Sequence, residues 1–262
     1  MQFRQSSLLD SLGAPGIHET SILDLFSGQV GFTGTTPVFA KPLRIMAFTN
    51  RCGSNLLADY LRQTGKIGGF HESLNHDTVA IAASRHSIAS FPDYIRYLFN
   101  SLAVDGNLGV KASWDQMAML SRWNIFAMFP GASVVHMRRS DVIGQAVSYW
   151  IAHQTRKWTS TQEGSNTEPV YDFVQIDRII ASINFSNATI PLVARVLNLP
   201  LTGVLYEGLT RDPRTVVTAL GRAIALDLSD WTPRQPRISR QADATNQDFL
   251  ERFVAELRDV LE

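Results

Sequence analysis

Continuous apolar runs alternate along the chain with segments whose apolar residues recur at helical spacing. LRIMAFT at 43–49 is an unbroken apolar run between Pro42 and Asn50, which predicts a buried strand. Further strands are predicted at 107–113, 132–139 and 201–209. Helices are predicted at 54–66, 91–103, 114–126, 140–158, 171–199, 212–226 and 245–261. This alternation predicts a single α/β domain with a mainly parallel central sheet flanked by helices.

The start of the chain does not share this pattern. Residues 1–40 are rich in Gly, Ser and Thr and lack clear periodicity, so we predict a partly ordered N-terminal arm at 1–40 and one domain at 41–262. The polar segment TSTQEGSNTEP at 159–169 is either a mobile lid or a plain linker. No internal repeat or low-complexity segment divides the chain further.

Composition narrows the class of protein. The 24 basic and 24 acidic residues cancel, which argues against bulk binding of nucleic acid or of a membrane surface. No apolar run approaches the roughly 18 residues of a membrane span, and the start MQFRQSSLLDSLGAPG has no signal-peptide core. Cys52 is the single cysteine, so no internal disulfide is expected. We expect a cytoplasmic protein without an integral membrane segment.

The turn after the first predicted strand, NRCGSN at 50–55, has the chemistry of an anion site. Gly53 and Ser54 supply a tight turn and a hydroxyl at a helix start, where unpaired N–H groups attract oxyanions. Asn55 adds an amide donor and Arg51 a forked cation. The pattern GxxxxGK[ST] of magnesium-dependent nucleotide triphosphatases is absent, which disfavours metal-dependent ATP chemistry. An ordinary strand-to-helix turn is the alternative.

A second candidate anion site follows the strand predicted at 132–139. Arg138 and Arg139 leave the end of this strand, and Ser148 lies about two turns into the next helix. Two arginines and a hydroxyl suit one phosphate, although paired arginines are also common on solvated faces. The carboxyl ends of parallel strands meet at one edge of a sheet. Two oxyanion sites at that edge suit a ligand with phosphates at both ends, such as a 3′,5′-bisphosphorylated adenosine.

Several stretches of the chain resemble one enzyme family. The chain contains, in this order, FTNRCGSNLLADYLRQTG, GFHES, LGVKASWDQM, HMRRSDVIGQAVSYWIAHQTRKW, LYEGLTRDP and SRQADATNQDF. Together, over roughly residues 43–255, they resemble the bacterial trehalose 2-sulfotransferase family, which uses 3′-phosphoadenosine 5′-phosphosulfate (PAPS). The family's first loop reads RSGSTLL, whereas this chain has Cys52 for Ser and Asn55 for Thr. The resemblance implies a P-loop-like fold of the sulfotransferase and nucleotide-kinase type.

The resemblance also implies how the donor is held. The loop after the first strand would cradle the 5′-phosphosulfate through Arg51, Cys52, Gly53, Ser54, Asn55 and Leu56. Arg138 and Ser148 would hold the 3′-phosphate, with Arg139 as their helper or as the true partner. Arg240 and Gln241, in the stretch SRQAD, would reach back to the nucleotide. The family uses PAPS as the sulfate donor and no metal.

Catalytic groups are implied in the same way. The stretch GGFHESL corresponds to the family's GxPxEFF-like stretch, which makes Glu72 the base for the acceptor hydroxyl, although the Pro and both Phe are missing. His71 and His76 are rivals for this role. Lys111, in the family's GxKxxW pattern, would stabilise the transferring sulfuryl oxygens or line the acceptor pocket. A structural lysine with a buried stem is the alternative.

A further group of residues would contact the acceptor. These residues are His71, Trp114, Gln154 and Trp158. The last two belong to the family's QTxxW pattern and would form the floor of a sugar site or brace a homodimer. Tyr206 and Glu207, at the end of a predicted strand, are interpreted as packing residues for the next helix.

We therefore expect a PAPS-dependent sulfotransferase that moves a sulfuryl group to a hydroxyl of a carbohydrate or glycolipid-like acceptor and releases 3′,5′-ADP. An ATP-dependent small-molecule kinase on the same scaffold is one alternative. A non-catalytic nucleotide- or glycan-binding protein, in which Glu72 has no role, is the other. The expected partners are a small-molecule or carbohydrate acceptor and a second copy of the chain, not nucleic acid. His18, His86, His136 and His153 show no metal-ligand spacing, so no metal site is expected.

Overall fold

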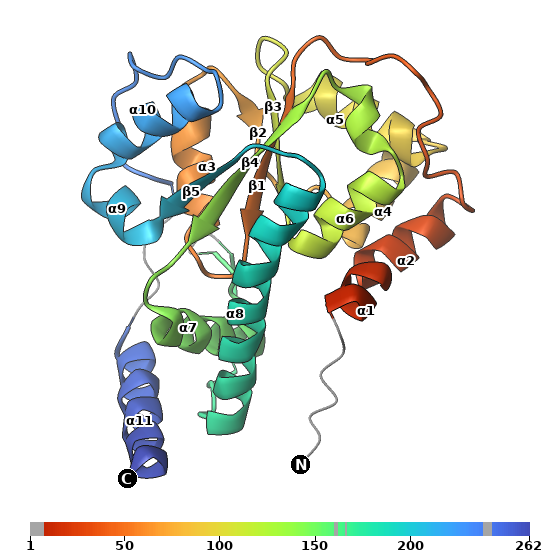
Figure 1. The fold of residues 1–262 in the computed structure, drawn as a ribbon. Helices are drawn as coiled ribbons and strands as arrows, with labels where there is room; N and C mark the ends of the chain where they lie inside the picture. The colour runs from red at the N-terminus through yellow and green to blue at the C-terminus, as the bar shows by residue number, and fades with distance from the viewer. Residues whose placement is uncertain (1–7, 160–161, 166, 238–242) are drawn as a thin grey trace. The chain divides into compact units, whose positions relative to one another are not determined.

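Five strands form the central sheet of the computed structural model (Figure 1), which describes residues 8–159, 162–165, 167–237 and 243–262. The strands are β1 (Leu43–Phe48), β2 (Gly68–Gly69), β3 (Leu108–Ala112), β4 (Ala132–Arg138) and β5 (Leu201–Leu205). Their order is β2-β3-β1-β4-β5. β3 pairs in parallel with both β1 and β2, and Met46 lies opposite Lys111. The prediction of an α/β fold with a mainly parallel sheet is confirmed.

Helices join the strands, and several begin at side chains that accept hydrogen bonds from the first free N–H groups. The helices are α1 (Leu8–Gly13), α2 (Ile17–Leu25), α3 (Ser54–Gln63), α4 (His76–His86), α5 (Phe91–Leu102), α6 (Trp114–Arg122), the 3-10 helix η1 (Ile125–Met128), α7 (Val142–Thr155), α8 (Phe173–Val196), α9 (Tyr206–Arg211), α10 (Pro213–Ala223) and α11 (Ala244–Leu261). Ser90 accepts from Asp93 N–H before α5, with Pro92 in the first turn. Asp212 caps α10 through Thr215 N–H. These signals fix where the helices begin.

The structure corrects one predicted strand and adds another. The strand predicted at 201–209 is wrong beyond Leu205, because Tyr206–Arg211 form α9. The sequence does not predict β2, because both of its residues are glycines, which are poor strand formers. A Cβ on Gly69 would overlap the carbonyl oxygen of Gly109, so only glycine lets the two backbones come this close.

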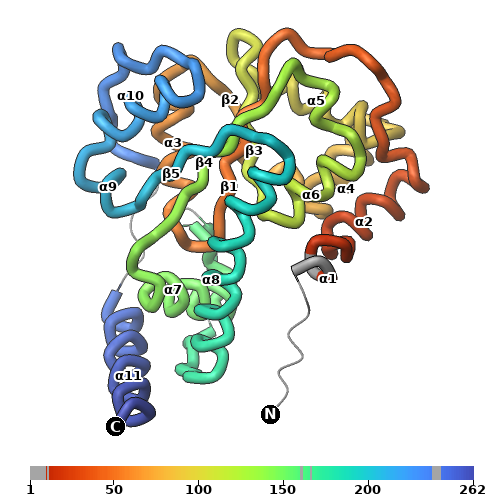
Figure 2. Tube along the Cα trace, viewed as in Figure 1, coloured from red at the N-terminus to blue at the C-terminus, as the bar shows by residue number. Residues whose placement is uncertain are grey.

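The described chain forms two compact units, each with its own apolar packing. The first unit comprises the described residues up to Ala47, Gly65–His136 and Ile190–Thr202, and the second comprises Phe48–Thr64, Met137–Thr189 and Gly203–Glu262. The first unit buries Ile45 of β1 and Leu120 of α6 in one core. In the second unit α7 packs against α11 (Figure 2), and a core joins Val147 to Phe249 and Phe253.

Helix α8 is the one helix in the described part of the chain that is long and apolar enough to cross a membrane, judged by length and composition. It has 24 residues, and 28% of its most apolar stretch is buried. The sequence shows no unbroken apolar run here because Asp177 and Arg178 interrupt the pattern. A single such helix is weak evidence for a membrane span, since core helices of soluble proteins share this composition. The absence of an integral membrane segment stays a prediction.

An ion pair fastens the arm helix α2 to α6 within the first unit. Arg122 Nε donates to Glu19 Oε1 at 2.8 Å, and Nη2 donates to the second carboxylate oxygen. Glu19 is 6% exposed, and the hydrogen bond between the two side chains raises the pKa of Arg122. Arg122 also donates to the carbonyl of Leu12, in α1, at 3.0 Å. Hydrogen bonds from the Arg122 guanidinium therefore fix both helices of the arm to α6.

We predict that Arg122→Met lowers the free energy of unfolding by about 2 kcal/mol, because it leaves a buried carboxylate without its charged partner. Urea denaturation followed by circular dichroism measures this change. Arg96→Met is the matched control, since Arg96 and Asp93 form an exposed pair, and exposed pairs contribute less than about 1 kcal/mol. Equal effects of the two substitutions would contradict the special role of the Glu19 pair.

Candidate active site

The loop between β1 and α3 has a backbone shape that few residues adopt. Arg51 has a φ of 65° and Gly53 a φ of 94°, both in the left-handed region. A Cβ on Gly53 would also overlap the Tyr206 ring, which packs against the loop. Gly53 is the N-cap of α3, and no side chain of the described residues caps the helix there. The start of α3 is therefore suited to bind an anion.

Two arginines of the second unit come together near this loop. Arg51 Nε donates to Ser148 Oγ at 2.9 Å, and Arg51 Nη1 donates to the carbonyl of Trp158. Burial lowers the pKa of Arg51, and the nearby charge of Arg139 lowers it further. Guanidinium groups within electrostatic range repel each other, so negative charge bound near them would stabilise both. The pair therefore has the electrostatics of a phosphate or sulfate site.

Arg139 rather than Arg138 has the geometry of an anion ligand. The Arg139 side chain is 16% exposed, and its Nη2 donates to Asp141 at 2.6 Å. Its Nε is buried and has no hydrogen-bond partner within the described part of the chain. A buried donor left unpaired costs free energy unless a ligand accepts from it. Arg138 is exposed at the end of β4, and Ser148 accepts a hydrogen bond from Arg51. The assignment of Arg138 and Ser148 to the 3′-phosphate stays a prediction.

Glu207 fixes the start of α7, a role that the sequence analysis missed. Its carboxylate accepts hydrogen bonds from the backbone N–H of Ser140, at 3.0 and 3.2 Å, and of Asp141, at 3.4 Å. Partial burial favours the neutral acid, but backbone donors outweigh this effect and lower the pKa of Glu207. The ring of the neighbouring Tyr206 lies 5.5 Å from the Arg139 guanidinium. An acidic residue directly after a strand was the available signal, and Tyr206 and Glu207 together position the loop and Arg139.

In the first unit, strand pairing brings Glu72 to Lys111. The segment after β2 keeps the parallel register, since Phe70 N–H donates to Gly109 O at 2.7 Å and Lys111 N–H donates to His71 O at 3.2 Å. Lys111 Nζ then donates to Glu72 Oε1 at 2.7 Å. The Lys111 side chain is 1% exposed and that of Glu72 is 41% exposed. A buried ammonium thus holds one oxygen of a carboxylate that still reaches solvent, an arrangement suited to accepting a proton from a bound hydroxyl.

The two rival bases have different surroundings. His71 is exposed, directly before Glu72. His76 begins α4, and its Nδ1 lies 2.8 Å from Nδ1 of His18, which belongs to α2 of the arm. His76 is therefore engaged with the arm, whereas Glu72 is engaged with Lys111. The contact of His18 with His76 could not be predicted from the sequence, because the arm has no clear periodicity.

The residues predicted to contact the acceptor are distributed over both units. Trp114 is partly buried against the core of the first unit. Gln154 donates to Val170 O at 3.0 Å and accepts from Val170 N–H at 2.9 Å, so it clamps the backbone after the 159–169 loop. Trp158 holds Arg51 through its carbonyl. Trp158 is thus a predicted acceptor residue that directly contacts the loop between β1 and α3.

The other loop residues divide into packed and accessible ones. Cys52 is 0% exposed and Ser54 is 5% exposed. Asn55 and Leu56 are partly buried. Cys52 therefore has the environment of a small packed residue and is shielded from solvent.

Two predicted nucleotide ligands, Arg240 and Gln241, lie outside the described residues. The chain just before them is fixed to α3, since Arg237 N–H donates to Asp59 Oδ2 at 3.2 Å. Across the residues that the structure describes, no group of three or more His, Cys, Asp or Glu side chains could hold a metal ion.

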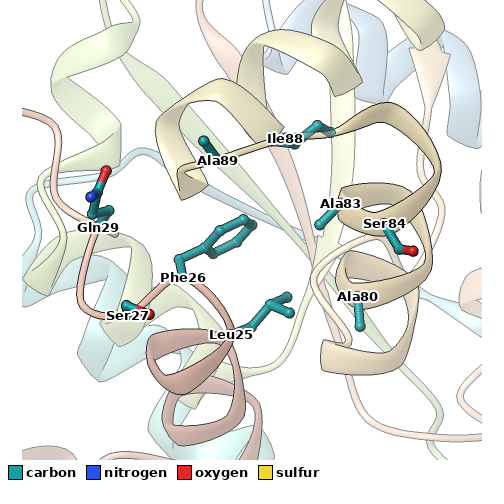
Figure 3. Close-up of a pocket in the computed structure, with 9 residues that line it drawn as sticks. All are labelled: Leu25, Phe26, Ser27, Gln29, Ala80, Ala83, Ser84, Ile88 and Ala89. Carbon is teal, nitrogen blue, oxygen red and sulfur yellow. The ribbon is translucent and has the colours of Figure 1, made fainter.

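A pocket in the first unit lies apart from these polar groups (Figure 3). Leu25 and Phe26, at the end of α2, face Ala83 of α4 across it. None of its lining residues carries a charge. The polar contact between the same two helices, His18 with His76, is at their other ends. This pocket is therefore not an anion site.

Comparison with solved structures identifies the fold. A sulfotransferase from Alicyclobacillus acidocaldarius aligns with 83% of this chain and 92% of its own chain, with a TM-score of 0.51 and 16% identity. The chain therefore has the fold of the sulfotransferases.

The family follows from sequence comparison. The Stf0 sulphotransferase family matches residues 111–256, which is more than half of the chain, so the protein belongs to the Stf0 sulphotransferase family. Trehalose 2-sulfotransferase of Mycobacterium tuberculosis is 25% identical over 259 residues, which cover 82% of this chain and 95% of the relative. Trehalose 2-sulfotransferase of Mycolicibacterium smegmatis is 28% identical over 124 residues, 46% of this chain and 45% of the relative. The resemblance inferred from the motifs is confirmed.

The histidine pair between the arm and α4 generates a prediction on pH. Burial lowers the pKa of His18 below its ordinary 6.5, and His76 lowers it further, against the charges of Asp115, Asp77 and Glu72. The unfolded chain then binds this proton more readily than the folded protein, so the stabilisation is present above about pH 6.5 and is lost as the pH falls. We predict that the thermal midpoint decreases between about pH 7.5 and about pH 5.5, and that His18→Asn reduces this decrease.

His153→Asn is the control for this measurement, because His153 is an exposed histidine of α7 in the second unit. It should leave the pH dependence of the thermal midpoint as in the wild type. The same dependence in the wild type and in His18→Asn would show that the histidine pair does not couple the arm to pH.

Proposed function

We propose that the protein transfers a sulfuryl group from PAPS to a hydroxyl of a carbohydrate or glycolipid-like acceptor. The observation that carries this proposal is the pair of arginines beside the loop before α3, Arg51 and Arg139, in which the buried Nε of Arg139 has no partner among the described residues. Membership of the Stf0 sulphotransferase family supports the reaction class. The name trehalose 2-sulfotransferase, carried by two relatives, supports PAPS as donor and a sugar-like acceptor.

The donor would be held by residues of the second unit. Arg51 and the start of α3 would bind the 5′-phosphosulfate, and Arg139 would bind the 3′-phosphate, which gives its buried Nε an acceptor. PAPS, when bound, supplies the sulfuryl group, and its transfer leaves negative charge on the 5′-phosphate. Arg51 is already held by Ser148 and by the carbonyl of Trp158, so it can stabilise this charge without rearrangement.

Glu72 would accept the proton of the acceptor hydroxyl. The acceptor oxygen forms the new O–S bond while the S–O bond to the 5′-phosphate breaks, and the proton passes to the Glu72 carboxylate. Lys111 keeps this carboxylate in place through the 2.7 Å ion pair. We favour Glu72 over His76 because the His76 ring is bonded to His18, and over His71 because the ion pair with Lys111 holds the Glu72 carboxylate in place.

The localisation, metal use and partners of the enzyme are proposed from the sequence. We propose a cytoplasmic enzyme that works without a metal, does not bind nucleic acid and forms a homodimer. The 24 basic and 24 acidic residues balance each other, which supports the proposal that the protein does not bind nucleic acid, since nucleic-acid binding requires an excess of basic residues. Arginines and a helix start, rather than a metal ion, would neutralise the phosphates.

We predict that the protein binds 3′,5′-ADP equally well with and without magnesium, measured by isothermal titration calorimetry. Arg139→Ala should weaken this binding about tenfold or more, because a charged hydrogen bond to phosphate contributes about 1.5 kcal/mol or more. Arg138→Ala is the matched control, since this neighbouring arginine is exposed, and its effect should stay below about threefold.

A larger loss in Arg138→Ala than in Arg139→Ala would assign the 3′-phosphate to Arg138 instead. A wild-type protein that gives no binding heat in either buffer would overturn the proposed function.

We predict that Glu72→Gln lowers kcat about 100-fold or more, because glutamine keeps the size of the side chain but cannot take the proton. The affinity for 3′,5′-ADP should not change. The measurement is the mass gain of acceptors in a screen of sugars, glycolipids and small alcohols with PAPS. His76→Gln is the comparison, and a loss of kcat in His76→Gln with normal turnover in Glu72→Gln would move the role of base to His76.

A further inference from the structure

Two residues of helix α7, Gln145 and Ser148, bind the loop between β1 and α3. The side chain of Gln145 donates from Nε2 to Thr49 Oγ1 at 2.9 Å and to Asn50 O at 2.7 Å. One turn further along the helix, Ser148 accepts the hydrogen bond from Arg51. Residues three apart lie on the same face of a helix. One face of α7 therefore contacts three successive residues of the chain as it leaves β1.

Gln145 is buried at an energetic cost. It is 0% exposed, and its Oε1 is buried without a hydrogen-bond partner among the described residues. Its neighbours Ala146 and Val147 belong to the apolar core of the second unit. A buried amide with one unsatisfied oxygen destabilises the fold. Packing alone therefore does not account for a glutamine at this position.

The hydrogen bond to Asn50 fixes the orientation of the peptide between Asn50 and Arg51. In a trans peptide the C=O and N–H groups point in opposite directions, and no described peptide bond is cis. Holding the Asn50 oxygen against Gln145 therefore turns the Arg51 N–H away from Gln145. Arg51 has a φ of 65°, a conformation that a non-glycine residue keeps only when its surroundings hold it. Gln145 supplies two of the contacts that hold it.

We infer that Gln145 is a positioning residue for donor binding: it keeps the loop in the shape that presents Arg51 and the start of α3 to the phosphosulfate end of the nucleotide. This inference rests on the proposed function. Gln145 acts through Thr49 and Asn50 and does not itself contact the nucleotide. Without its two donors, the peptide after Asn50 can rotate and Arg51 can relax to negative φ. Nucleotide affinity then falls, whereas the Glu72–Lys111 pair of the first unit is unaffected.

Gln145→Met tests this inference, because methionine has a similar length but no N–H donor. Calorimetry with 3′,5′-ADP should show binding about tenfold weaker or more, and the KM for PAPS should rise by a similar factor while the KM for the acceptor is unchanged. Val147→Ala is the matched control, since Val147 is 1% exposed on the same helix and cannot hydrogen-bond to the loop. It should lower the thermal midpoint and keep nucleotide affinity within about twofold of the wild type.

Gln145→Glu adds a pH dependence of nucleotide affinity that a loss of packing would not produce. The ionised carboxylate repels the Asn50 oxygen, whereas the neutral acid donates one hydrogen bond. Burial favours the neutral acid. The affinity of Gln145→Glu for 3′,5′-ADP, relative to the wild type at the same pH, should therefore recover as the pH is lowered from about 8.5 to about 6.5.

Three outcomes decide the inference. The inference is overturned if Gln145→Met binds 3′,5′-ADP as tightly as the wild type. It is also overturned if the affinity of Gln145→Glu relative to the wild type does not change with pH. Both outcomes leave the proposed function intact. A wild-type protein that does not bind 3′,5′-ADP would overturn both. Should Gln145→Met fail to fold, the pH dependence of Gln145→Glu decides the question.

Discussion

The second unit depends on one constraint: Arg51 must keep a left-handed backbone close to Gly53. A conformation of this kind costs about 1–3 kcal/mol for a non-glycine residue, so surrounding contacts have to hold it. Ser148 of α7 bonds the Arg51 side chain across 97 residues of sequence. The Tyr206 ring, at the start of α9, packs against Gly53 of the same loop. The loop therefore takes its shape only when distant parts of the second unit have folded around it.

The first unit has a different energetic cost, because it buries the ammonium group of a lysine. Lys111 is 1% exposed, and leaving such a charge without a partner costs several kcal/mol. Glu72 supplies the partner, and the glycine backbone of β2 allows the close approach that brings it there. Apolar side chains of similar volume would often stabilise a fold as well as a buried ion pair does. Under the proposed function, the chemistry of Glu72 gives a reason for this pair beyond stability.

Much of the fold and the chemistry of the loop can be predicted from local sequence. β1 and β3 end within one or two residues of their predicted limits, because turn residues bound their apolar runs. The sequence does not say which way adjacent side chains point. Arg138 and Arg139 follow each other at a strand end, where successive side chains lie on opposite faces, so their order cannot tell which one is buried. The role of Gln145 cannot be predicted from local sequence for another reason, since its partner Asn50 is 95 residues away.

Under the proposed function, the acceptor would be bound beside the arm, where the sequence signal is weakest. The ion pair of Glu19 with Arg122 fixes α2, and His18 then meets His76 within electrostatic range of Glu72. Under the proposed function, the donor is the same compound in every reaction, so the residues that bind its two phosphates are constrained by a fixed geometry. The acceptor has to bring only one hydroxyl to one carboxylate. Under the proposed function, changes in the arm would alter the acceptor while the loop, α7 and α9 keep the donor site intact, which agrees with motifs of the resemblance that begin only after residue 42.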